Sequence, residues 1–396
     1  RTRRTMHDVQ GTPPALAGED PAAGLVPLLR EHAAATERRR RLVPEVVDGI
    51  AAAGLFGLAV PTRHGGAQAG LPAQVRTLAE LARGCAATAW TLSIYLTGSW
   101  LTGLFPEETG AEVFDGAASR IAVTLSPSGV LTEGPGGLRL TGRWGFNSGV
   151  ADSHWDVLGA FRPTADGREH VLVLVPTAAL TVHDDWYASG LQGTGSSSVE
   201  CADLPVPAAR VLPFPTGAAV PGGDPDAVGL PRYEVFPLFS TLNAGTPLGI
   251  ARAAADFLIE RAPGRPVAFS AHQDQSQDPL THRKLGEVDV KRRLAVLLAD
   301  DLADRTERLA RAHRPHTLAE RSTARASAAT VAALCREAVD LVASACGASS
   351  VRADVPVQRM RRDIHALCLH AGLNPDTALE LQGRILLGQT PQTTFL

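Results

Sequence analysis

A histidine in an apolar stretch is the residue of this chain best suited to chemistry. His370 follows Ile364, Leu367 and Leu369 in an expected C-terminal helix. Imidazole titrates near neutral pH, so it can donate a hydrogen bond to a bound reactant or accept a proton from one. A lone histidine in such a helix is more often a core residue, so a chemical role requires partner residues elsewhere.

The segment Gly142–Gly149 offers such partners. It reads Gly-Arg-Trp-Gly-Phe-Asn-Ser-Gly. Trp144 and Phe146 provide flat apolar surface and Ser148 provides a hydroxyl, which suits a planar aromatic cofactor with polar ring atoms. The alternative is that both aromatic residues fill a core from one face of a strand, with Ser148 in a turn.

Composition excludes several other classes of function. Five scattered cysteines indicate neither a disulfide framework nor a metal site. The formal net charge of −3 gives no general attraction to nucleic acid, and the run Arg38–Arg41 is interpreted as a solvated helix face. No long apolar stretch or signal-peptide pattern is present, so we expect no membrane span and a cytoplasmic location. Arg1–Thr5 precede Met6 and are left out of the fold prediction.

The hydrophobic pattern divides the chain into three expected domains. Residues 6–117 show helical spacing of apolar residues. Residues 118–231 alternate short β-branched runs with Gly and Pro turns, which favours a small β-barrel or sandwich. Residues 232–396 return to long helices joined by short loops, which is typical of a four-helix bundle. These helices are expected at 242–261, 279–312, 317–345 and 361–387.

The C-terminal residues and this domain order resemble the acyl-CoA dehydrogenase superfamily. A loop after Cys346 leads through Pro356-Val-Gln-Arg to the pair Arg362-Asp363. In acyl-CoA dehydrogenases of the medium-chain kind, the catalytic glutamate follows the arginine of this pair by nine positions, and that position is Ala371 here. The resemblance therefore implies an acyl-CoA dehydrogenase-like fold that lacks the usual base. Arg362 and Asp363 are expected to form a structural ion pair.

The form Gly-x-Trp-x-Phe-x-Ser-Gly is similar to one branch of this superfamily, the oxygenase components of two-component flavin-dependent monooxygenases. The resemblance implies that Trp144, Phe146 and Asn147 bind the flavin and that Ser148 bonds at its N5 atom. It also implies that a histidine after the Arg-Asp pair reaches the flavin C4a region. We therefore prefer His370 as the catalytic residue over His365, which would lie about 140° away around the same expected helix.

The same resemblance assigns other residues to the cofactor. Thr124 and Ser126 stand where dehydrogenases carry a turn that cups the flavin pyrimidine. Gly195 and Ser196 stand in a glycine-rich turn that can approach phosphate or ribityl oxygens. Arg265 falls near the place of an arginine that reaches a neighbouring subunit's flavin phosphate. Plain turns are the alternative for the first two pairs.

The resemblance also indicates a substrate pocket. Trp90 and Tyr95 follow Cys85-Ala-Ala-Thr, which resembles an element that walls the pocket of these oxygenases. His370 would face the same pocket. Packing inside a helical core is the alternative for each aromatic residue.

We therefore predict the oxygenase component of a two-component flavin-dependent monooxygenase. Reduced FMN or FADH2 would come from a separate NAD(P)H:flavin reductase and react with O2 to form a C4a-hydroperoxyflavin. This species would hydroxylate a small aromatic or natural-product substrate in a dry pocket. The resemblance also implies a homotetramer.

Three other functions remain open at this point. One is an N-oxygenase of an amino sugar on the same fold. Another is an acyl-CoA dehydrogenase with a relocated base, such as Asp354 or Glu380. The third is a binding protein without catalytic activity.

Overall fold

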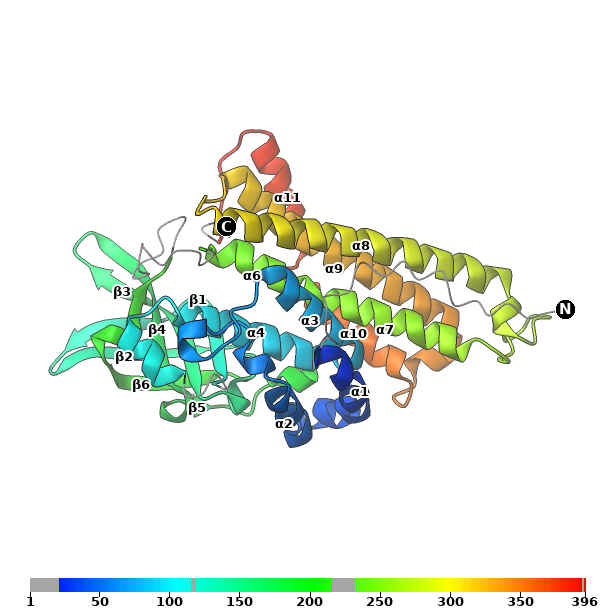
Figure 1. The fold of residues 1–396 in the computed structure, drawn as a ribbon, viewed down its shortest axis with the longest axis horizontal. Helices are drawn as coiled ribbons and strands as arrows, with labels where there is room; N and C mark the ends of the chain where they lie inside the picture. The colour runs from blue at the N-terminus through cyan, green and yellow to red at the C-terminus, as the bar shows by residue number, and fades with distance from the viewer. Residues whose placement is uncertain (1–20, 115–118, 216–231, 394) are drawn as a thin grey trace.

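The computed structural model describes residues 21–114, 119–215, 232–393 and 395–396. Helices come first, a β-sheet follows, and long helices end the chain, so the predicted order is confirmed. In Figure 1 the sheet lies at one end of the molecule and the long helices extend away from it. The expected domain boundaries at 117/118 and 231/232 involve residues outside those described.

The N-terminal helices surround one helix that is buried along almost its whole length. Nearly every residue of α4 is buried, because it lies between the sheet and the helices around it. The extended backbone of Cys85 separates α3 from α4. The helices are α1 (Pro21–Arg39), α2 (Pro44–Ala52), α3 (Leu71–Gly84), α4 (Ala86–Thr102) and α5 (Glu107–Val113).

The middle of the chain forms one seven-stranded sheet in the order β5-β6-β2-β1-β3-β4-β7. The run Val171–Val175 alternates between two cores: Val171 and Val173 face a core that the sheet builds around Trp144, whereas Leu172 and Leu174 join the core shared with the helices. Burial on both faces explains why the run is continuously apolar. The strands are β1 (Ile121–Gly134), β2 (Gly137–Trp144), β3 (Trp155–Thr164), β4 (Gly167–Pro176), β5 (Thr181–Val182), β6 (Val199–Val206) and β7 (Val211–Pro213).

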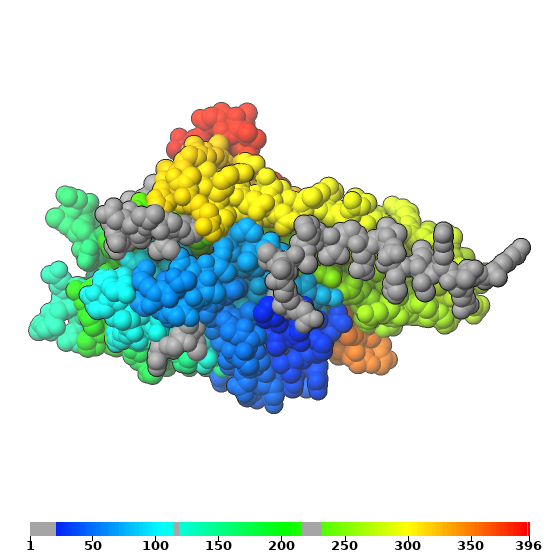
Figure 2. Space-filling model, viewed as in Figure 1, coloured from blue at the N-terminus to red at the C-terminus, as the bar shows by residue number. Residues whose placement is uncertain are grey.

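The C-terminal part is the expected helical bundle, with α7, α8, α9 and α10 packed together. Its helices are α6 (Val235–Asn243), α7 (Gly245–Arg261), α8 (Pro279–Arg311), α9 (Leu318–Cys346), α10 (Pro356–Leu367) and α11 (Pro375–Leu386). In Figure 2, α8 forms a long ridge on the surface of the molecule. Among the described residues, no helix is long and apolar enough to cross a membrane.

Two of the expected helices are divided in the structure. The expected helix 242–261 breaks at Ala244, between α6 and α7. The expected helix 361–387 is two helices, because α10 ends at Leu367 and α11 begins at Pro375. Asn374 caps α11 by accepting hydrogen bonds from two backbone N–H groups. Pro375 also disfavours helical backbone at Asn374, the residue before it. His370 therefore lies in a turn rather than on a helix.

Arg362 and Asp363 anchor α10, but not by pairing with each other as predicted. Arg362 forms an ion pair with Glu37 of α1 at 2.5 Å. Asp363 accepts a hydrogen bond of 2.7 Å from the backbone N–H of Leu191, which ties α10 to the loop before β6. The two neighbouring side chains thus hold two different parts of the molecule against the bundle.

A buried carboxyl group lies inside the sheet domain. Asp156 of β3 has no exposed surface and accepts a hydrogen bond of 2.5 Å from the Asn147 side-chain amide. Asn147 is equally buried; its side-chain NH2 is used by Asp156, and its Oδ1 has no hydrogen-bond partner. Burial raises the pKa of Asp156 from 3.8 to about 7, although the Asn147 bond opposes this.

This raised pKa makes stability depend on pH. The folded chain keeps the Asp156 proton up to about pH 7, whereas the unfolded chain releases it near pH 4. We expect the free energy of unfolding to fall as pH rises through this window, by up to about 1.4 kcal/mol per pH unit. Asp156→Asn should remove this contribution to the pH dependence of the free energy of unfolding, which is measured by urea unfolding at several pH values. The exposed Asp203→Asn on β6 is the control, and equal slopes for wild type and Asp156→Asn would contradict the expectation.

Candidate functional site

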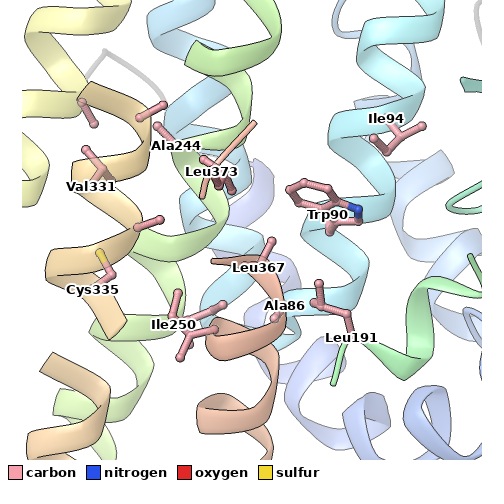
Figure 3. Close-up of a cluster of buried hydrophobic side chains, with 14 of the residues drawn as sticks. Ala86, Trp90, Ile94, Leu191, Ala244, Ile250, Val331, Cys335, Leu367 and Leu373 are labelled. Carbon is pink, nitrogen blue, oxygen red and sulfur yellow. The ribbon is translucent and has the colours of Figure 1, made fainter. Parts of the chain in front are cut away.

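Trp90 connects the three parts of the molecule. It projects from α4, and its indole Nε1–H donates a hydrogen bond of 3.1 Å to the Ser148 hydroxyl of the sheet domain. The centroid of its ring lies 5.0 Å from that of His370 in an edge-on arrangement. Figure 3 shows the indole pointing from α4 toward the segment that carries Leu367 and Leu373. Ser148 and His370, predicted as catalytic from distant segments, thus meet on one aromatic side chain.

His370 lies in a mostly apolar environment. Its ring packs beside Trp90 and also beside Phe239 of α6, with a centroid distance of 5.7 Å to the latter. Burial lowers the pKa of His370 to about 4, so the imidazole is neutral at physiological pH. Its Nδ1 accepts a hydrogen bond of 3.1 Å from the backbone N–H of Gly372.

This bond determines which nitrogen carries the proton. A neutral imidazole has one N–H, and an Nδ1 that accepts a hydrogen bond leaves the proton on Nε2. Within the described ranges of the chain, no protein group forms a hydrogen bond with Nε2 of His370. The side chain therefore presents an unused N–H donor, and a role as donor fits better than a role as base.

His365 does not reach the junction that Trp90, Ser148 and His370 form. It is exposed on α10 and bonds to Asp340 at 3.0 Å. The predicted angular separation of the two histidines does not apply, because the helix ends before His370. Their different surroundings separate them instead.

Three hydroxyl groups continue from Trp90 into the sheet domain. Ser148 Oγ lies 2.7 Å from Ser196 Oγ, which lies 2.6 Å from Thr194 Oγ1. Thr194 Oγ1 donates to the backbone carbonyl of Leu191 at 2.8 Å. All three hydroxyl side chains are buried.

Gly195 allows the turn that carries these hydroxyls. Its φ of +53° is left-handed, and a Cβ there would lie 2.6 Å from the carbonyl oxygen of Arg40. Gly195 also lines a shallow surface cavity with Arg39, Arg40 and His183. The predicted Gly195 and Ser196 thus face different surroundings, the surface and the buried hydroxyls.

Trp144 lies inside the sheet domain. It is fully buried, and its indole N–H donates to the carbonyl of Gly159 at 2.7 Å. Gly129 and Gly142 leave room for its ring, since a Cβ at either would collide with it. Trp144 has no exposed surface to offer a cofactor, so the core alternative describes it better than the predicted flavin wall.

Phe146 points the other way. Strand β2 ends at Trp144, and the left-handed backbone of Phe146, with φ of +58°, turns its ring outward. The ring is 81% exposed and its centroid lies 5.9 Å from that of Trp186. It is therefore available to a ligand, unlike Trp144.

Thr124 and Ser126 lie where the pairing of β1 with β3 is interrupted. The register shifts between Thr124 and Gly129. The Thr124 hydroxyl is buried without a hydrogen-bond partner, whereas Ser126 is exposed. A buried hydroxyl without a partner is costly, which makes Thr124 a candidate for contact with a ligand.

Tyr95 and Arg265 are not part of the junction. The Tyr95 hydroxyl donates to the carbonyl of Gly149 at 2.6 Å, and its fully buried ring packs on Phe56. Because Tyr95 is five residues from Trp90 on a helix, it faces another direction, and it does not line the predicted substrate pocket. Arg265 lies in the connection between α7 and α8, at the end of the bundle remote from the sheet (Figure 1). It donates a hydrogen bond to the carbonyl of Cys346.

The carboxylates considered as relocated bases are also elsewhere. Asp354 is exposed and paired with Arg352, and Glu380 is exposed and paired with Arg384. Ala371, at the position of the dehydrogenase glutamate, is exposed. The structure therefore gives no support to a relocated base at either residue.

Sequence reasoning did not identify Phe239 or the role of Thr194. Phe239 belongs to the apolar run of α6, which carries no signal beyond its hydrophobicity. Thr194 lies in the same glycine-rich turn as the predicted Gly195 and Ser196, but its contact with Ser196 depends on how the turn folds.

Comparisons with known proteins agree with this architecture. The family described as "Acyl-CoA dehydrogenase, N-terminal domain" matches residues 27–105, and "Acyl-CoA dehydrogenase, C-terminal domain" matches residues 242–375. A pigment production hydroxylase of Rhodococcus sp. is 30% identical over 93% of this chain and 95% of its own length. The oxygenase component of an FADH(2)-dependent resorcinol hydroxylase of Rhizobium sp. is 28% identical over 94% of each chain.

Solved structures show the same relationship. XiaF from Streptomyces sp., in complex with FADH2 and glycerol, superposes with a TM-score of 0.88 at 27% identity, covering 94% of this chain and 96% of its own. The 3-HSA hydroxylase of Rhodococcus sp. RHA1 gives 0.87 at 26% identity, covering 96% and 99%. The chain belongs to the acyl-CoA dehydrogenase superfamily, in its branch of flavin-dependent oxygenase components.

Proposed function

We propose that this chain is the oxygenase component of a two-component flavin-dependent monooxygenase that hydroxylates a small aromatic molecule. It would use O2 and a reduced flavin, FMN or FAD, delivered by a separate NAD(P)H:flavin reductase. The observation that carries the proposal is the junction at Trp90, which brings Ser148 and His370 together from the sheet and the bundle.

Several groups of the chain suit a flavin ring. An isoalloxazine needs apolar walls and a few polar partners at its ring edge. Phe146 offers an exposed ring, Thr124 a buried hydroxyl without a partner, and Ser148 a hydroxyl beside Trp90. When bound in its reduced form, the flavin would provide the chemistry that activates O2. The residues of the chain would hold it and keep water away.

His370 would act as a hydrogen-bond donor. Its neutral ring holds a proton on Nε2 and packs beside the rings of Trp90 and Phe239. In this apolar environment a directed N–H stabilises a polar oxygen atom more strongly than it would in water. Of the two roles predicted for His370, orienting the reacting oxygen and deprotonating the substrate, we favour the first.

An aromatic substrate fits this environment. Trp90 and Phe239 would meet a planar ring through stacked or edge-on contacts. Relatives of the chain are named for such compounds, among them p-hydroxyphenylacetate 3-hydroxylase of Acinetobacter baumannii and indole-3-acetate monooxygenase of Pseudomonas putida. An amino sugar would find few polar partners on these two rings.

We further propose that the chain forms a homotetramer through α8. Val290, Leu294 and Leu297 are each more than half exposed and follow one another at helical spacing. Such a stripe on a helix favours packing against another helix. In an assembly of this kind Arg265 would reach a neighbouring subunit, in keeping with its position at the far end of the bundle.

The function is tested by supplying the protein with photoreduced FMN or FAD anaerobically and then admitting oxygen. Resorcinol and p-hydroxyphenylacetate are suitable first probes, and ¹⁸O2 should label the hydroxylated product in mass spectrometry. The proposal fails if no tested aromatic compound is hydroxylated and reoxidation of the flavin is no different from that in buffer. Reduction of bound oxidised flavin by an acyl-CoA would instead indicate a dehydrogenase.

His370→Ala should keep flavin binding but lower the hydroxylation rate by about a hundredfold, with hydrogen peroxide released instead of product. The reason is the loss of the Nε2–H donor. His365→Ala is the matched control, because that histidine is exposed on α10, and it should hydroxylate like the wild type. Unchanged product yield in His370→Ala would remove His370 from the mechanism.

The pH dependence separates a donor from a base. Because the pKa of His370 is lowered to about 4, its ring stays neutral above about pH 5. We expect the ratio of the wild-type rate to the His370→Ala rate to stay constant between about pH 5.5 and 8.5. If His370 acted as a base with an ordinary histidine pKa, this ratio would instead fall below about pH 6.5. Such a fall would contradict the donor role.

A further inference from the structure

The chain of buried hydroxyls has a fixed direction. A carbonyl oxygen has no proton to give, so Thr194 must donate its single hydroxyl proton to Leu191. Ser196, 2.6 Å from Thr194, must then donate to Thr194. Ser148, 2.7 Å from Ser196, must in turn donate to Ser196. Each hydroxyl has one proton, so the order follows from the carbonyl at the end.

This order leaves Ser148 as an acceptor. Its proton points to Ser196, and one of its two lone pairs accepts the Trp90 indole N–H. The remaining lone pair is the only hydrogen-bonding capacity that Ser148 has left for a ligand. A ligand atom that carries hydrogen would be bound, and one that presents a lone pair would be repelled.

The turn around the hydroxyls is held from several sides. The backbone N–H of Leu191 donates to the buried Asp363 of α10, which orients the peptide next to the accepting carbonyl. The backbone of Gly193 packs against Thr36 of α1, and Gly195 packs against the carbonyl of Arg40. The hydroxyls therefore cannot easily rearrange to reverse their protons.

We propose that Thr194 and Ser196 are positioning residues that make the site select reduced over oxidised flavin. Reduced flavin carries a hydrogen on N5, which can be donated to Ser148. Oxidised flavin presents a lone pair at N5, which would face the lone pair of Ser148. This inference rests on the proposed function and on Ser148 facing N5.

The test compares the affinity of each variant for oxidised FMN or FAD with its affinity for the same flavin reduced anaerobically. In Ser196→Ala the Ser148 proton loses its acceptor and is free to turn toward N5. In Thr194→Val the Ser196 proton is freed and can turn to Ser148, which releases the Ser148 proton as well. We expect the preference for reduced flavin to fall about tenfold in both, with tighter binding of the oxidised form.

Other variants separate this effect from general damage to the site. Ser148→Ala should also lose the preference, because it removes both the acceptor for the N5 hydrogen of reduced flavin and the lone pair that faces oxidised N5; its main effect should be weaker binding of reduced flavin. Thr194→Ser should behave like the wild type, since it keeps the hydroxyl. Ser153→Ala is a matched control, because Ser153 pairs with Thr177 at 2.7 Å in a similar hydroxyl pair outside the site.

Two results would overturn the inference. One is an unchanged affinity for each flavin form in both Ser196→Ala and Thr194→Val. The other is equal weakening of both flavin forms, which would mean that the two residues only support the fold. If the wild-type protein binds neither form, the proposed function fails together with the inference. If it binds reduced flavin and hydroxylates normally while the ratio does not respond, the inference alone fails.

Discussion

The indole N–H of Trp90 is a buried donor that requires an acceptor, and the structure is arranged around satisfying it. A buried N–H without a partner costs about 1–3 kcal/mol, so α4 and the sheet domain must keep the Ser148 hydroxyl within reach. The other side of the ring supports the turn that carries His370. One side chain thus fixes the distance between two segments more than two hundred residues apart in the sequence.

The same arrangement explains how this scaffold can serve a chemistry different from proton abstraction. A dehydrogenase places a carboxylate at the position of Ala371, whereas here the buried carboxyl group of Asp363, earlier in the chain, accepts a hydrogen bond from the backbone N–H of Leu191. What remains beside Trp90 is a neutral imidazole and a hydroxyl. Groups of this kind position and stabilise polar atoms in a dry environment, and they do so without introducing a buried charge.

Particular residues show how far the sequence could be interpreted. The short β-branched runs in the middle of the chain predicted strands, and Val171–Val175 lies in one, β4; only the structure shows that it is buried on both faces. The expected helix 361–387 overlooked Asn374-Pro375, although both residues favour a helix start. Trp144 and Phe146 were expected to act together, but the end of β2 and a left-handed backbone send them to opposite sides.

The sequence by itself determined the order of helices and strands, the family and the loss of the glutamate at 371, because these depend on hydrophobic periodicity and on residue identity at fixed spacing. Only the tertiary structure decided which candidates meet. Tyr95 and Trp90 differ by a helical rotation, and Ser148, Ser196 and Thr194 form a directed series only through contacts between separate segments. The tertiary structure also decides the protonation state of His370, because the ring is neutral through burial that no local sequence pattern encodes.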